Sequence, residues 1–270
     1  MRPLPPVLAI SAFLAFVAAT TSCSNAPPPP PPPVPGPFPS NNPPAVDALI
    51  KKVTTRYGTA KSYRDKGTGT TTLASLGTTR LDFDTAFARD GGFRWRYTND
   101  LLPGGSVRRT SAVWSSDGEA WNFWSELTGK TTQSKSLGMA LAGPIGVSNG
   151  LARIVPELLL PNQGRSTLFI GLTDPVVRGK ETLSGVECDV IDGGILGTEG
   201  STTIWIDATG AIRKYRQTMK VDPSKLPPPP SQGSPGGMPT KPFEVVTEFV
   251  FDPQFDVEVS ASDTAFTPPS

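Results

Sequence analysis

The 270-residue chain offers few side chains that could carry out catalysis. It contains no histidine, so it lacks the usual general base near neutral pH and the commonest metal ligand. Its two cysteines, Cys23 and Cys188, are too few to build a zinc or iron–sulfur site. Cys188 lies between Val186 and Val190 on one face of a predicted strand, which favours a buried, unreactive thiol. We therefore predict a protein that is not an enzyme and that binds no metal or cofactor.

Two short motifs suggest chemistry, and each has a simpler explanation. Asp82 and Asp84 could offer two carboxylates to a metal ion, but their spacing places both on the solvated face of an alternating strand. The triplet 129–131 (Gly-Lys-Thr) resembles the end of a phosphate-binding loop, but Trp124 stands where the first glycine of such a loop belongs. Neither motif predicts a site.

The residues best suited to bind a ligand are apolar and lie on predicted strands. A strongly curved sheet has a concave face that a few helices cover only in part, and each buried methylene group of an acyl chain contributes about 0.8 kcal/mol. An apolar cavity could therefore hold a lipid without any catalytic group. The alternative is that the same side chains form a closed core. The candidates for lining such a cavity are Phe83, Phe93, Trp95, Tyr97, Trp114, Trp121, Phe123, Ile204, Ile206, Tyr215 and Phe249.

The N-terminus reads as a lipoprotein signal peptide over residues 1–22. Arg2 precedes a 13-residue apolar run, Val7–Ala19, which is too short to span a bilayer. The small residues that follow and Cys23 resemble a bacterial lipobox, although Thr20 stands where leucine is usual. This resemblance implies that Cys23 is acylated and anchors the chain in a membrane. The alternative is ordinary signal cleavage near Ala26, which would discard Cys23.

Residues 23–44 are predicted to hold the lipidated cysteine and a tether. Twelve of the 21 residues from 24 to 44 are proline, which favours an extended polyproline II spacer of roughly 60 Å. Ser24 follows Cys23, whereas an acidic residue there would resemble an inner-membrane retention signal. The lipoprotein resemblance therefore implies the outer membrane, with the domain facing the periplasm. Without residues 1–22, which carry Arg2 and no acid, basic and acidic residues balance at 24 each. This balance excludes nucleic acid binding by net charge, and we expect a monomer.

Residues 45–270 are predicted to form one domain made mostly of antiparallel strands. Val46, Leu49, Ile50, Val53 and Tyr57 have helical spacing, so the domain opens with an amphipathic helix. Alternation of apolar and polar residues then predicts strands, and two tight turns at 116–119 and 208–210 predict hairpins. The predicted strands cover 80–87, 93–97, 112–115, 120–125, 186–190, 202–207, 211–221 and 243–251.

Two segments interrupt the strands. Residues 136–160 are rich in Leu, Ala and Gly and predict short helices, the second near Leu151–Leu160, where Pro156 is tolerated only in the first turn. Residues 222–242 contain eight prolines and predict an exposed loop.

This order of elements resembles the LolA/LolB superfamily of bacterial lipoprotein carriers, and in particular its lipoprotein-sorting-like branch. The resemblance implies an α+β fold, mostly antiparallel β, in which an incomplete and strongly curved β-barrel packs over a few α-helices and holds acyl chains. The Pro-rich insertion at 222–242 departs from the plain pattern. The stretches that carry the resemblance are 46–67, 83–97, 112–121, 172–192 and 204–214.

These observations lead to a cell-envelope lipoprotein that carries or accepts acyl chains or lipoproteins. Two alternatives remain open at this point. One is an envelope-stress regulator of the RseB type, which would bind lipid and a protein partner. The other is a structural envelope lipoprotein with a filled core and no ligand.

Overall fold

The computed structural model describes residues 42–74, 76–101, 107–160, 168–169, 171–225 and 241–269. The predicted first helix is present as α1 (Pro44–Thr59), with proline at its first position, where the missing N–H costs nothing. Its apolar stripe is buried through Val46, Val53 and Tyr57. The expected helical spacing therefore describes a real contact surface.

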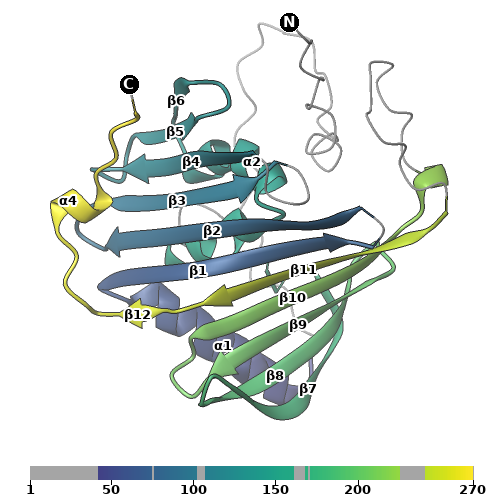
Figure 1. The fold of residues 1–270 in the computed structure, drawn as a ribbon. Coiled ribbons are helices and arrows are strands. Elements are labelled where there is room, and N and C mark those ends of the chain that lie inside the picture. Colours follow the sequence, from purple (N-terminus) through teal and green to yellow (C-terminus); the bar gives the residue numbers. More distant parts are fainter. Residues whose placement is uncertain are drawn as a thin grey trace, which may run out of the picture.

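Within the described residues, twelve antiparallel strands form a single sheet, in the order β6-β5-β4-β3-β2-β1-β11-β10-β9-β8-β7, with β12 pairing β1 (Figure 1). The strands are β1 (Ser62–Leu73), β2 (Gly77–Ala88), β3 (Phe93–Asp100), β4 (Arg108–Ser115), β5 (Trp121–Ser125), β6 (Lys130–Ser134), β7 (Leu172–Leu183), β8 (Val186–Ile195), β9 (Gly200–Asp207), β10 (Ile212–Val221), β11 (Phe243–Phe251) and β12 (Gln254–Phe255).

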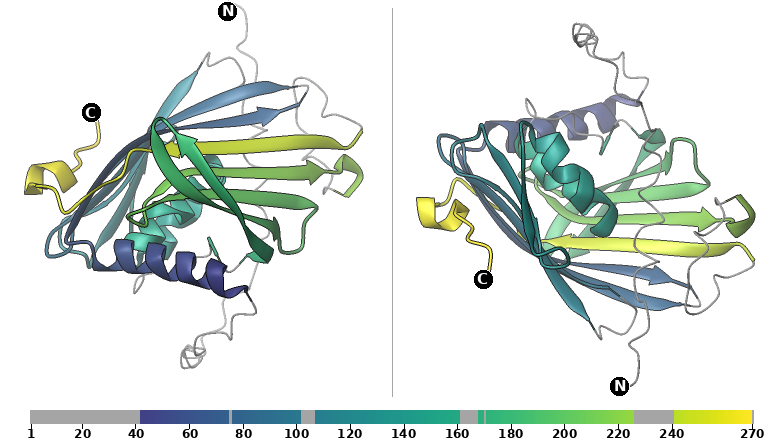
Figure 2. Two further views of the ribbon diagram at one scale, coloured as in Figure 1. Left: turned by 90° about the horizontal axis from the view of Figure 1, so that it is seen from below. Right: turned by 90° about the horizontal axis from the view of Figure 1, so that it is seen from above.

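The sheet consists of two meanders, β1–β6 and β7–β11. Each strand within a meander pairs with its neighbours in sequence, and the two meanders join where β11 pairs with β1. Viewed from either end, the sheet bends strongly around the helices (Figure 2). In the described part of the chain β6 and β7 are the two edges and do not pair with each other, so the barrel is incomplete.

The helices between the two meanders lie with α1 on the concave side of the sheet (Figure 2). They are α2 (Leu137–Val147), the 3-10 turn η1 (Leu151–Arg153) and α3 (Val155–Leu159). As expected, the second helical segment is short and carries Pro156 in its first turn. One core cluster joins these helices to the concave face of both meanders.

The predicted fold class is therefore confirmed: the domain is mostly antiparallel β, strongly curved and wrapped over a few helices. Both predicted hairpins are present, as β4–β5 and β9–β10. Four strands were not predicted, one of them the two-residue β12. β6 is short and polar, and β7 contains Pro175 and two register shifts that break its alternation.

The remaining unpredicted strand, β1, has glycine where an apolar side chain would signal a strand. Gly67 and Gly69 are on the concave face of the sheet. Gly67 lies between Phe83 on β2 and Phe251 on β11, and Gly69 lies between Leu81 on β2 and Phe249 on β11. A Cβ atom on Gly67 would lie 2.2 Å from Phe83 Cζ and 2.4 Å from the Val250 carbonyl oxygen. A Cβ on Gly69 would lie 2.6 Å from Phe249 Cδ1. The rings of the neighbouring strands thus fill the space that β1 leaves empty.

The signal peptide, Cys23 and all of the predicted tether except residues 42–44 fall within residues 1–41, and most of the Pro-rich loop falls within 226–240, so these predictions lie outside the described residues. Pro44, the predicted end of the tether, is the first residue of α1. In the part of the chain that the structure covers, no helix has the length and apolar character needed to cross a membrane.

Candidate functional site

The candidate site is the concave face of the sheet, and strand register determines which side chains reach it. Paired residues of adjacent antiparallel strands point to the same face, and successive residues point to opposite faces. Ten of the eleven candidates belong to the concave core cluster or pack against it. They are Phe83, Phe93, Trp95, Tyr97, Trp121, Phe123, Ile204, Ile206, Tyr215 and Phe249.

The expectation that Trp114 faces the concave side is wrong. Trp114 pairs with Arg94 on β3 and Asn122 on β5, whereas its neighbour Val113 pairs with Trp95. Val113 therefore takes the inward position and Trp114 points to the convex face. There its ring contacts Phe266 at a centroid distance of 4.8 Å. The segment 112–115 holds three small or apolar residues around one tryptophan, so alternation alone did not fix its direction.

Most of the candidate side chains are tightly enclosed. Trp95, Tyr97 and Trp121 are each 1% exposed. The Trp95 and Tyr97 rings lie 4.6 Å apart between centroids, and Phe93 meets Trp121 edge-on at 5.6 Å. Such contacts are typical of a packed interior, so these residues support the site more than they expose a surface to solvent.

A border of half-buried apolar residues surrounds this interior. Phe123 and Tyr215 are the two candidates that belong to it. The Phe123 ring lies beneath α2, 3.6 Å from where a Cβ of Gly143 would be, and the Tyr215 ring stacks on Phe249 at 6.0 Å. The remaining half-buried residues packed on the core are Leu49, Ile50, Ile145, Val147, Leu160, Leu168, Phe169, Leu172, Val177 and Phe255.

A buried carboxyl group on the concave side of β1 was not anticipated. Asp65 is 2% exposed and accepts hydrogen bonds from the Tyr63 hydroxyl and the Asp252 N–H, both at 2.9 Å. Burial raises the pKa of Asp65 from 3.8 to about 7, although both hydrogen bonds oppose this shift. The available signal was the placement of Tyr63 and Asp65 on one face of a strand, alternating with Arg64 and Lys66 on the other. This signal is weak because the same face carries both an aromatic and an acidic residue.

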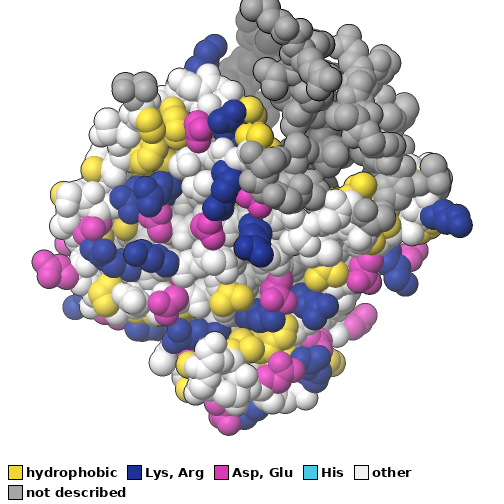
Figure 3. All heavy atoms as spheres, in the orientation of Figure 1, with side chains coloured by type: hydrophobic (Ala, Val, Ile, Leu, Met, Phe, Trp, Pro, Cys, Tyr) yellow, Lys and Arg dark blue, Asp and Glu magenta, His cyan; other side chains and the backbone are white. Residues whose placement is uncertain are grey.

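The convex face is polar and carries interspersed charges of both signs (Figure 3). As predicted, Asp82 and Asp84 lie on this face. Arg108 binds Asp82 at 2.7 Å, and Arg94 and Arg96 each bind Asp84 at 2.8 Å. These ion pairs occupy the two carboxylates that could have offered oxygen ligands to a metal.

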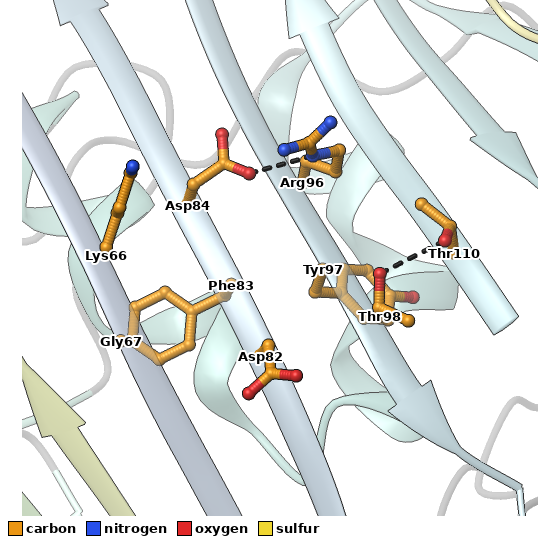
Figure 4. A pocket seen from close by; sticks show the side chains of 9 residues that line it. All are labelled: Lys66, Gly67, Asp82, Phe83, Asp84, Arg96, Tyr97, Thr98 and Thr110. Atoms are coloured by element: carbon orange, nitrogen blue, oxygen red, sulfur yellow. Dashed lines mark hydrogen bonds and ion pairs between the residues drawn. The ribbon is translucent and has the colours of Figure 1, made fainter. Parts of the chain in front are cut away.

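A shallow hollow of about 330 Å³ lies over β1–β4 on this convex face (Figure 4). Lys66, Asp82, Asp84 and Arg96 surround it, and Thr98 and Thr110 hydrogen-bond to each other at 3.0 Å along its border. The charged side chains that line it make it unsuited to an acyl chain.

Cys188 is buried, as predicted, in a small cluster with Val190 and Trp205. Burial raises the pKa of its thiol, which disfavours the reactive thiolate. The indole N–H of Trp205 donates to Glu181 Oε2 at 2.7 Å. This cluster is separate from the concave core.

Comparison with known proteins finds similarity at the level of fold. Neither a protein-family model nor a curated protein sequence matches the chain. Among solved structures, the lipoprotein LppX of Mycobacterium tuberculosis is 14% identical and has a TM-score of 0.41, with 81% of this chain and 98% of that chain covered. LprF of Mycobacterium bovis is 10% identical, with a TM-score of 0.41 and coverage of 82% and 97%. A LolA superfamily protein of Nitrosomonas europaea is 9% identical, with a TM-score of 0.33 and the same coverage. Likenesses this distant do not bear on what the chain binds.

Proposed function

We propose that this protein is a cell-envelope lipoprotein whose concave face binds acyl chains, carried either by free lipids or by lipoproteins. The observation that carries the proposal is the border of half-buried apolar side chains around the helix-covered interior. These side chains pack against the core and are only partly buried. Covering them with methylene groups would contribute about 25 cal/mol per Å² of apolar surface removed from water.

Within this proposal, the ligand first contacts half-buried aromatic residues and not the most deeply buried ones. Trp95 and Trp121 are enclosed by neighbours, whereas Phe123 and Tyr215 keep part of their surface exposed. We therefore assign the first contact with an acyl chain to Phe123 under α2 and to Tyr215 on β10. No catalytic step is part of this function.

A second candidate function is that of a structural lipoprotein with a closed interior. It is favoured by the near-complete burial of Trp95, Tyr97 and Trp121. Under this alternative, the half-buried apolar residues are ordinary surface of the kind every folded protein retains.

Lipid binding by the full chain distinguishes the two candidates. The Cys23→Ser variant, purified without detergent, is analysed by native mass spectrometry and by titration with a fluorescent fatty acid. We expect co-purified lipid and saturable binding of the probe. Phe123→Gln should weaken binding about ten-fold, because it places an amide where a methylene chain packs. The matched control is Leu196→Gln, which changes a residue that is 69% exposed and outside the core. A protein that carries no lipid and binds no probe would establish the closed interior.

Cell fractionation tests the proposed anchor. The wild type should take up labelled palmitate and fractionate with outer membranes, and Cys23→Ser should take up none and appear in the soluble periplasmic fraction. Acyl labelling that persists in Cys23→Ser would contradict the anchor while leaving the proposed ligand untouched.

A further inference from the structure

Seven buried side-chain atoms have no hydrogen-bond partner within the described residues, and they fall into two groups. Four belong to charged side chains, namely Arg56, Arg94, Arg109 and Asp192, and each of these side chains forms an ion pair through its other atoms. The other three are neutral: Thr85 Oγ1, Tyr97 Oη and Trp121 Nε1.

The three neutral groups lie on the same face of neighbouring strands in one half of the sheet. Thr85 on β2 pairs with Trp95 on β3, and Tyr97 is two residues further along that strand on the same face. Trp121 begins β5 and contacts Phe93, which also lies on the concave face of β3. All three groups therefore face the interior between β2 and β5. Buried polar groups normally have partners, so three in one region of an otherwise apolar wall need an explanation.

Among the three groups, Trp121 Nε1 most narrowly restricts the kind of ligand atom that can pair with it. An indole nitrogen can donate a hydrogen bond but cannot accept one. Trp121 is 1% exposed, and Phe123, which borders the half-buried surface under α2, is its nearest neighbour on the same face of β5. A ligand group that reaches Trp121 Nε1 from this border must therefore carry an acceptor.

The Tyr97 hydroxyl also lacks a hydrogen-bond partner among the described residues, unlike the hydroxyls of the other buried tyrosines. The Tyr63 hydroxyl donates to Asp65 at 2.9 Å, and the Tyr57 hydroxyl accepts from the Ile212 N–H at 3.2 Å. The Ser111 hydroxyl lies opposite Tyr97 and acts to lower its pKa, which burial raises. Even so, the two oxygens do not reach hydrogen-bond geometry, and Ser111 donates to Ser125 instead.

We infer that the concave face of β2–β5 selects acyl esters, with Trp121 Nε1 and Tyr97 Oη donating to ester carbonyl oxygens and Thr85 Oγ1 available as a third donor. An ester carbonyl is a neutral acceptor, so it satisfies these donors without bringing a charge into an apolar interior. A hydrocarbon or an ether chain offers no carbonyl oxygen to these donors. This inference rests on the proposed function and adds a chemical selectivity to it.

The test compares two lipids that differ only in their carbonyl groups: dipalmitoylglycerol, a diester, and dihexadecylglycerol, its diether counterpart. Each lipid displaces a fluorescent fatty acid from the full chain carrying Cys23→Ser. We expect about ten-fold tighter binding of the diester, and we expect Tyr97→Phe and Trp121→Phe to weaken the diester several-fold with little change for the diether. Because Trp121→Phe also shrinks the ring, Tyr97→Phe is the decisive variant.

The stability of the lipid-free protein provides an independent readout. Tyr97→Phe removes a hydroxyl without a partner, so the midpoint of urea unfolding should stay the same or rise. The control Tyr63→Phe removes a hydroxyl that is bonded to Asp65, so its midpoint should fall.

Each result either supports or overturns the inference. Three results would contradict the ester selectivity alone. They are equal affinity for diester and diether, an equal loss of affinity for both lipids in Tyr97→Phe, and an unfolding midpoint of Tyr97→Phe that falls as far as that of Tyr63→Phe. A chain that binds neither lipid contradicts the proposed function itself.

Discussion

The tryptophan side chains on the two faces of the sheet have different surroundings. Trp95 and Trp121 lie on the concave face, and Trp114, Trp124 and Trp205 lie on the convex face. On the convex face each ring is covered from outside: Phe266 packs on Trp114 and Trp124, and Lys214 lies 5.0 Å above the Trp205 ring.

The hydrogen bonding of the two faces differs as well. The indole N–H of Trp205 has an acceptor in Glu181, whereas that of Trp121 has none within the described residues. The chain itself thus satisfies the indole of Trp205 on the convex face. On the concave side the hydroxyls of Tyr57 and Tyr63 also have partners, whereas Tyr97 Oη and Trp121 Nε1 have none among the described residues.

The largest expected effect separates a concave tryptophan from a convex one. Trp95→Gln should lower the free energy of unfolding by about 3–5 kcal/mol, because it leaves a void and buries an amide. The matched change Trp114→Gln should cost about 1 kcal/mol, since the ring is half-exposed and contacts mainly Phe266. Urea unfolding of both variants measures the difference. Equal losses would mean that the interior around Trp95 is open.

A pH-dependent effect is expected from the buried carboxyl of Asp65. The pKa of about 7 in the folded chain lies above the value of 3.8 expected on unfolding, so the folded state holds the proton more tightly. Stability of the wild type should therefore fall as the pH rises from about 4 to about 7. The asparagine of Asp65→Asn cannot ionise. The free energy of unfolding of this variant should therefore rise relative to that of the wild type across this window, by about 2–4 kcal/mol at pH 8.

Urea unfolding at pH 4.5 and pH 8 tests this prediction. The control is Asp82→Asn on the convex face, where the side chain is 56% exposed, and this variant should change stability by less than about 1 kcal/mol at both pH values. A gain for Asp65→Asn that is the same at both pH values would show that Asp65 is already ionised at pH 4.5.

A smaller effect is expected at the junction of the two meanders. Gly67→Ala should cost about 1–3 kcal/mol, because the new methyl group meets the Phe83 ring and the Val250 carbonyl. Gly58→Ala is the matched control in α1, where a Cβ meets nothing within 4 Å, and it should stabilise the chain by about 1 kcal/mol through helix propensity. Thermal unfolding of the two variants should shift in opposite directions. A neutral Gly67→Ala would mean that β1 and β2 separate easily at this position.

The sequence predicted those parts of the fold in which local pattern and burial coincide. The spacing of Val46 to Tyr57 identified α1, and alternation around Phe83 and Trp95 identified β2 and β3 with the correct inward face. The hairpin at Asp117-Gly118 followed from turn chemistry alone. In each case the pattern that predicts the element lies within the residues of that element.

The sequence alone determined the class of the fold, the central helical segment and most of the apolar residues on the concave face. Tertiary structure decided what depends on neighbours from distant parts of the chain. The strand β1 exists because β2 and β11 supply the rings that cover its glycines, and Trp114 faces outward because Val113 takes the inward place. The missing partners of Tyr97 and Trp121 also appear only when the strands are assembled, because a side chain's own type cannot tell whether a hydrogen-bond acceptor will lie within its reach.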